Sequence, residues 1–225
     1  MNKEKEAVFE LSSMSMRTEG TSISRSIYNL IIGLTIFYGL GVNVLECIYL
    51  KEFFMNMNMW VLLIGYLVLA IAGCVMIAKT ESPAISFLGY NLLVLPVGAV
   101  VSVCVGQSNQ IAVTQAFVTT TIITATMTLL GTLWKDFFLK LGRVLFVSLL
   151  IFVVVQGLTI LISGTTPIIY SWIGAGIFTL FIGYDWSRAQ VSPPTPSNAI
   201  CNASSLYLDI VNLFLKLLRI FNSNS

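Results

Sequence analysis

The sequence contains no histidine, and charged residues make up only 10% of its 225 positions. Histidine is the commonest metal ligand and the usual side chain that titrates near neutral pH, so a response to pH must come from carboxylates or cysteines. The four cysteines form no CxxC pair, which argues against a zinc site or a disulfide framework. The net charge of +2 is too small to indicate nucleic-acid binding.

Apolar residues dominate instead, at 56% of the chain, and the mean hydropathy is +0.89. Soluble domains carry about 25% charged residues, and a helix needs about 20 apolar residues to cross a bilayer. We therefore predict an all-α, polytopic membrane protein. A tail, residues 1–26, precedes a seven-helix transmembrane domain, residues 27–221. The predicted spans are residues 27–50, 60–78, 84–105, 111–133, 144–163, 167–184 and 198–220.

Lysine and arginine are unevenly divided between the two sides of these spans. Nine fall in the tail or in connections on its side, and only Lys51 falls in a connection on the other side. Positive residues favour the cytosolic side, so we predict a cytosolic N-terminus. The polar tail lacks the pattern of a secretory signal peptide. Lys216 and Arg219 leave open whether residues 198–220 cross the membrane or only re-enter it.

The last segment, SLYLDIVNLFLKLLRI, carries Asp209 among apolar residues, and a carboxylate in hydrocarbon is costly without a partner or water. Six polar residues recur there at spacings of three and four, which predicts one helix face turned to the bundle interior or to water. Two alternatives are a helix lying flat on the membrane and a packing face on which Lys216 or Arg219 neutralises Asp209. This polar stripe consists of Asn202, Ser205, Asp209, Asn212, Lys216 and Arg219.

A second carboxylate, Asp185, lies near the inner end of the sixth segment, in FIGYDWSRAQ. One interpretation is that Asp185 ends its helix and faces the cytosol. The other is that it meets Asp209, although simple helix geometry leaves about 7 Å between their depths. If the two carboxyl groups meet, they share a proton and act as a gate and pH sensor. When both are ionised, they offer oxygen ligands to a cation such as Ca²⁺.

Two further groups are candidates for lining a path through the membrane. Glu46, near the outer end of the first segment, either extends to the surface or lines the path with Asn43. The fourth segment is rich in threonine, and Thr121 shares one face with Thr114 and Thr128 at a spacing of seven. That face either packs against another helix or lines a wetted cavity.

Several stretches resemble one known family over roughly residues 25–221. FIGYDWSRA followed by NASSLYLDIVNLFLKLLRI resembles the C-terminal signature of the Bax inhibitor-1 family, the transmembrane Bax inhibitor motif proteins. FLGYNLLVLPVGAVVS resembles the third span of that family, and TLWKDFFLKLGRVLFVSLLI its fourth loop and fifth span. The separation of 24 residues between Asp185 and Asp209 also fits the two aspartates of the family.

The resemblance implies a seven-helix fold in which the other six helices wrap the last one. It also implies a pH-sensitive leak of calcium, with Asp185 and Asp209 closing the pore near the cytosolic side. An arginine of the second helix often supports the pair; here Lys79 is the candidate at that place, and lysine cannot form a bidentate clamp. YDWSRA also replaces the more usual Tyr-Asp-Thr-Gln pattern. Further candidates are Arg188 and Asn212 for support, and Asn202 and Ser205 for the lining.

Two other classes of function remain as alternatives to a cation leak. One is a membrane interaction protein that regulates a partner such as a membrane protease. The other is an intramembrane aspartyl protease, but its Gly-x-Gly-Asp and Pro-Ala-Leu motifs are absent from this sequence. We therefore expect no enzymatic activity and no bound cofactor, with Ca²⁺ as the transported ion. The short loops suit a bacterial protein of the cell membrane.

Overall fold

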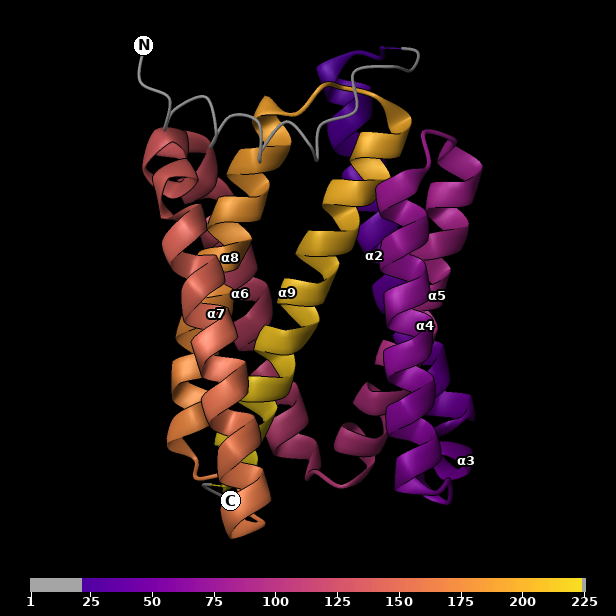
Figure 1. Ribbon diagram of the computed structural model, residues 1–225, viewed down its shortest axis with the longest axis vertical. Coiled ribbons are helices and arrows are strands. Elements are labelled where there is room, and N and C mark those ends of the chain that lie inside the picture. The colour runs from indigo at the N-terminus through magenta and orange to yellow at the C-terminus, as the bar shows by residue number, and fades with distance from the viewer. Residues whose placement is uncertain (1–21, 224–225) are drawn as a thin grey trace.

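The computed structural model describes residues 22–223, which form seven long helices and one short one. The long helices lie side by side in a bundle (Figure 1). No strand occurs in this range, so the predicted all-α class is confirmed, whereas residues 1–21 of the predicted tail lie outside the described residues. The helices are α2 (Arg25–Tyr49), α3 (Lys51–Met55), α4 (Met59–Lys79), α5 (Pro83–Gly106), α6 (Gln110–Leu133), α7 (Lys135–Ser163), α8 (Ile169–Val191) and α9 (Pro196–Ser223).

Several helices begin at capping residues. The side chains of Ser24, Asn109 and Thr195 each accept a hydrogen bond from the backbone N–H three residues further on, which satisfies a donor that has no partner inside the helix. Pro196 then takes the first position of α9, where its missing N–H costs nothing. These caps fix the residues at which α2, α6 and α9 begin, and so how many helical turns separate each later residue from the start of its helix.

The start of α7 differs from the prediction. The fifth span was expected to begin at residue 144, but α7 begins at Lys135, and only Trp134 separates it from α6. The stretch KDFFLKLGR contains no proline, and Asp136 in the first turn suits the positive end of the helix. Phe138 and Leu145, two turns apart, are buried on one face. The charged connection predicted here is therefore the first two turns of a helix.

The last helix is central, as expected. α9 packs against α8, α6, α2 and α5, and in Figure 1 it lies between a group formed by α2, α4 and α5 and a group formed by α6, α7 and α8. The expectation that all six other helices wrap α9 is wrong in detail, because α4 packs mainly on α5 and α7 mainly on α8. Both outer helices are strongly apolar and largely exposed, which fits contact with lipid.

α9 is one uninterrupted helix of 28 residues, about 42 Å long at 1.5 Å per residue. It runs from the α8–α9 connection to the opposite end of the bundle (Figure 1), so the re-entrant alternative and the surface-helix alternative are both wrong. By length and composition, five of the described helices can cross a membrane, namely α2 and α4–α7. α8 and α9 are of similar length but more polar, and several of their polar residues, including Asp185 and Asp209, are buried inside the bundle.

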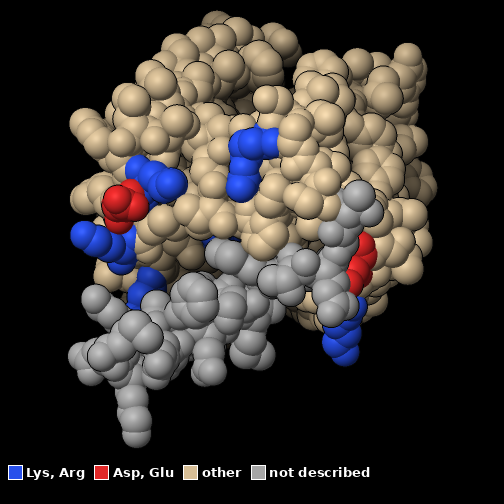
Figure 2. Space-filling view, turned by 90° about the horizontal axis from the view of Figure 1, so that it is seen from above, with Lys and Arg blue, Asp and Glu red and all other residues tan. Residues whose placement is uncertain are grey.

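We call the end at which α2, α5, α7 and α9 begin the N-terminal end of the bundle. Figure 2 looks onto this end and shows a few lysine, arginine and acidic side chains on a visible surface that is otherwise uncharged. The basic residues that the helix bounds place at this end are Arg25, Lys79, Lys135, Lys140, Arg143 and Arg188.

Candidate functional site

The relative depth of α8 and α9 is set by contacts near their short connection, residues 192–195. Asn202, in the second turn of α9, donates to Ser192 Oγ at 3.3 Å, so α9 begins beyond the end of α8. One turn deeper, Arg188 Nη2 of α8 donates to Ser205 Oγ of α9 at 3.0 Å. This offset removes the 7 Å difference in depth that simple helix geometry predicted between Asp185 and Asp209.

Asp185 of α8 and Asp209 of α9 meet inside the bundle. Their residues are only 5% and 8% exposed, and the Asp209 carboxyl lies within hydrogen-bonding reach of the Asp185 carboxyl. Arg188 Nη2 lies 3.2 Å from Asp185 Oδ1, the one ion pair found among residues 22–223. Asp209 Oδ2 is buried and has no hydrogen-bond donor within the described part of the chain. The aspartate pair therefore has one cation for two carboxyl groups.

This imbalance determines the chemistry of the pair. Two carboxylates in contact in a medium of low dielectric constant repel each other strongly, so they are most stable when one proton lies between them. Arg188 balances the single charge that remains. The unpartnered Asp209 Oδ2 is an acceptor that either a proton or a small cation can satisfy.

Of the three residues expected to support the pair, the structure brings only Arg188 to it. Lys79 is exposed at the end of α4, and no ion pair of Lys79 is found in residues 22–223. Asn212 donates to the Leu208 carbonyl of its own helix at 2.8 Å. The cation beside the aspartates thus comes from α8 itself, one turn after Asp185.

Asn202 anchors α9 to the start of α2. Its Nδ2 donates to the hydroxyl of Tyr28 at 2.9 Å and to the Asn198 carbonyl at 2.9 Å. Arg25 donates to the carbonyls of Ala189 and Ser192 at the end of α8, where a cation suits the negative end of the helix. Sequence reasoning missed this role of Arg25, because it was counted only as a charge that orients the chain.

The two cations of the polar stripe contact α7 and the α7–α8 connection, not the aspartate pair. Lys216 donates to Gln156 Oε1 of α7 at 3.2 Å, and its ammonium lies 5.0 Å from the centre of the Phe152 ring. Arg219 donates to the Thr166 carbonyl in the α7–α8 connection. Both groups lie toward the end of the bundle opposite the aspartates, so the hypothesis that Lys216 or Arg219 neutralises Asp209 is wrong.

Thr121 lines a cavity of about 610 Å³ between α2, α5, α6 and α9. Thr121 and Thr114 donate to carbonyls of their own helix, Phe117 and Gln110, so the cavity wall is mostly apolar. The buried hydroxyls of Thr120 and Thr124 have no hydrogen-bond partner in the described structure. The lining residues are Ile36, Leu40, Asn43, Val44, Cys47, Ile48, Val101, Val105, Val113, Thr114, Phe117, Thr120, Thr121, Thr124, Ala125, Ile210, Val211 and Phe214.

Glu46 does not extend to the surface. It is 5% exposed and lies beside Asn43, whose Nδ2 is 3.4 Å from Glu46 Oε2. The hydroxyl of Tyr207, on α9, donates to Asn43 Oδ1 at 2.6 Å. Sequence reasoning missed Tyr207, since a tyrosine in an apolar segment gives no sign of which helix its hydroxyl reaches.

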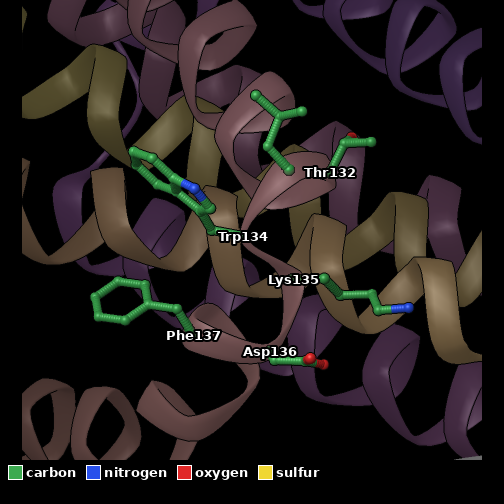
Figure 3. A pocket seen from close by; sticks show the side chains of 6 residues that line it. Thr132, Trp134, Lys135, Asp136 and Phe137 are labelled. Carbon is green, nitrogen blue, oxygen red and sulfur yellow. The ribbon is translucent and has the colours of Figure 1, made fainter.

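A separate crevice of about 700 Å³ lies where the chain passes from α6 to α7. It is lined by the consecutive residues 132–137. In Figure 3 the rings of Trp134 and Phe137 lie on one side of it, while the side chain of Lys135 points away from them. Neither aspartate of the pair lines this crevice, so it is separate from the candidate site.

Comparison with known proteins gives one family match and several partial relatives. The family described as "Inhibitor of apoptosis-promoting Bax1" matches residues 21–225. A Golgi anti-apoptotic protein of vaccinia virus is 36% identical over 109 residues, 48% of this chain and 46% of that protein. Mouse protein lifeguard 4 is 35% identical over 108 residues, 48% of this chain and 45% of that protein.

Yeast Bax inhibitor 1 is 40% identical over 76 residues, which are 31% of this chain and 25% of the yeast protein. The chain thus spans about half the length of the viral and mouse relatives, and less of the yeast one.

Proposed function

This chain belongs to the Bax inhibitor-1 family, and from that premise we propose that it is a pH-sensitive leak for calcium, gated by the aspartate pair. It is an all-α protein with several helices long and apolar enough to cross a membrane. The observation that carries the proposal is the contact between two buried carboxyl groups, Asp185 and Asp209, on neighbouring helices of the bundle.

The shared proton keeps the gate closed. While it lies between the two carboxyl groups, it holds α9 against α8 close to the N-terminal end. When it is lost, the two carboxylates repel each other, and both turn from a hydrogen-bonded pair into oxygen ligands for a cation. A rise in pH therefore both opens the contact and creates the ion site.

The ion site would bind calcium weakly, because it offers few ligands. Calcium takes six to eight oxygen ligands, and the aspartates with Ser205 Oγ supply fewer than that. No group of three or more histidine, cysteine or acidic side chains is found among residues 22–223. Weak binding suits passage, because an ion must leave its site as readily as it enters.

The basic residues at the N-terminal end support a cytosolic position for that end, since lysine and arginine are retained on the cytosolic side of a membrane. The aspartate pair would then close the pathway near the cytosol. We place the protein in the cell membrane, with calcium moving down its gradient.

Calcium uptake into proteoliposomes tests the proposal. For the wild type, uptake should rise as the pH is raised from about 6 to about 8, the range in which physiological switches titrate. Asp209→Asn should give uptake that no longer responds to pH on the side of the N-terminal end, since an amide cannot lose the shared proton. Equal pH dependence in both proteins would refute the gate.

The names of the relatives favour a second candidate function. The viral relative is named a Golgi anti-apoptotic protein and the yeast relative Bax inhibitor 1, and the second name describes action on another protein. By analogy, this chain would regulate a membrane-protein partner, such as a membrane protease. Co-purification of that partner with a variant in which both aspartates are replaced by asparagine would support this function over the leak.

A further inference from the structure

Glu46 of α2 is a second buried carboxyl group, separate from the aspartate pair. It lies three residues before the end of the helix at Tyr49, toward the end of the bundle that carries α3. Its carboxyl group fills the space beside Gly98 of α5: a Cβ atom at Gly98 would lie 1.5 Å from Glu46 Oε2. The absence of a side chain at residue 98 is thus what allows Glu46 to turn inward.

A single amide connects Glu46 to the central helix. Asn43 Nδ2 donates to the Val94 carbonyl at 3.2 Å and lies 3.4 Å from Glu46 Oε2, which is long for a hydrogen bond. Asn43 Oδ1 accepts the hydroxyl of Tyr207 at 2.6 Å. Tyr207 is fully buried and precedes Asp209 by two residues, so opposite faces of the same turn of α9 contact the two acidic sites.

No cation balances Glu46 in the described part of the chain. The titratable groups that interact electrostatically with Glu46 are the Cys47 thiol on α2 and the Tyr207 hydroxyl on α9, and these interact in turn with Lys51 of α3 and Tyr66 of α4. A lone carboxylate is costly in an apolar interior. One carboxyl group and one amide oxygen offer too few ligands for calcium, so the species that satisfies Glu46 is a proton.

Two neighbours of Glu46 on α2 line the cavity between α2, α5, α6 and α9. They are Asn43, whose amide contacts Glu46, and Cys47. The cavity therefore reaches to within one side chain, Asn43, of the Glu46 carboxyl group.

We propose that Glu46 is a second proton-exchange site, coupled to α9 through Asn43 and Tyr207. Loss of the proton leaves a carboxylate, which forms shorter and stronger hydrogen bonds than a neutral carboxyl group. The carboxylate draws the amide of Asn43 toward itself and away from Tyr207. α9 then loses one of the bonds that hold it in the position in which Asp209 meets Asp185. This last consequence rests on the proposed leak, whereas the proton site itself does not.

Infrared spectroscopy tests the proton site without any assumption about transport. The spectrum of the purified protein is recorded as a difference between two pH values for the wild type and for Glu46→Gln. The variant should lose one component of the carboxyl C=O band. The matched control is Glu52→Gln, because Glu52 is exposed on α3 nearby, and its spectrum should keep that component. A Glu46→Gln spectrum identical to the wild type would overturn the proposal.

A shorter acid keeps the test decisive if Glu46→Gln fails to fold. Glu46→Asp retains a carboxyl group at the same place and should retain a component of the band, shifted in frequency. A Glu46→Asp spectrum without any such component would also overturn the proposal.

Calcium uptake with the pH changed on one side of the membrane tests the coupling. The response to pH on the side that carries α3 should be lost in Glu46→Gln, while the response on the other side persists. Equal responses in both proteins would refute the coupling. If even the wild type takes up no calcium, the proposed leak fails, and the infrared measurement still decides the proton site.

Discussion

The guanidinium of Arg188 on α8 donates to the hydroxyl of Ser205 on α9 at 3.0 Å, and it does so with the same nitrogen that lies 3.2 Å from Asp185 Oδ1. One group therefore sets the depth of α9 against α8 and balances the charge of the aspartate pair. Any motion that separates the two helices near this point must break the contact with Ser205 and leave Arg188 with Asp185.

Two substitutions of Asp209 distinguish the effect of its hydrogen bond to Asp185 from the effect of its charge. Asp209→Asn keeps a donor that can bond Asp185, so we expect low calcium uptake at every pH on the side of the N-terminal end. Asp209→Ala removes that bond, which is worth roughly 1.5–3 kcal/mol when a charged group takes part, so uptake should be at least about tenfold higher and equally independent of pH on that side. Proteoliposome uptake measures both.

The control for these variants is Asp136→Asn, because Asp136 is an exposed carboxylate at the same end of the bundle. It should leave the pH dependence of uptake unchanged. Identical uptake by Asp209→Asn and Asp209→Ala would show that the bond to Asp185 does not hold the pathway closed.

Arg188→Gln should destabilise the protein. Removing one partner of a buried ion pair costs about 3–5 kcal/mol; we expect a smaller loss, of about 2 kcal/mol, because the Arg188 side chain is 26% exposed. Thermal unfolding in detergent measures the change. Arg143→Gln, at an exposed arginine of α7, is the control and should have little effect.

The double variant Arg188→Gln/Asp185→Asn tests whether the loss comes from the ion pair. With the carboxylate removed, no unpaired charge remains, so the double variant should be more stable than the sum of the two single changes predicts. Strictly additive effects would mean that Arg188 stabilises the fold through Ser205 alone.

Gly131→Ala should disturb the packing of α6 on α8. A Cβ atom at Gly131 would lie 2.8 Å from the Gly183 carbonyl oxygen, a backbone atom that cannot move aside, and overpacking of this kind costs roughly 1–3 kcal/mol. Gly157 of α7 has nothing within 4 Å of the same position. Gly157→Ala should therefore be neutral or slightly stabilising, by up to about 1 kcal/mol. Unfolding temperatures that fall equally in both variants would contradict this packing.

Lys216→Met should increase the leak. Lys216 is on the same stripe of α9 as Asp209, about 10 Å further along the helix, and a positive charge at that distance opposes a cation by roughly 1–2 kcal/mol at an effective dielectric constant of about 20. Removing it should raise calcium uptake up to about tenfold. Lys140→Met, at an exposed lysine of the other end, should leave uptake unchanged, and equal uptake by both variants would place Lys216 outside the pathway.

The sequence alone was sufficient for the class of fold, the approximate spans and the inward-facing stripe of the last helix. These follow from local rules: the length of an apolar run and the recurrence of polar residues every three to four positions do not depend on what a helix packs against. The same rules identified Asp185 and Asp209 as the residues to examine, although they left a gap between their depths.

Only the tertiary structure decided which side chains meet. The offset of α9 against α8 brings the two aspartates together, and the cation beside them is Arg188 and not Lys79. Glu46 faces inward beside Gly98. Each of these outcomes depends on the relative depth and rotation of two helices. That geometry arises from caps, connections and small residues far away in the chain, so no pattern within a single segment contains it.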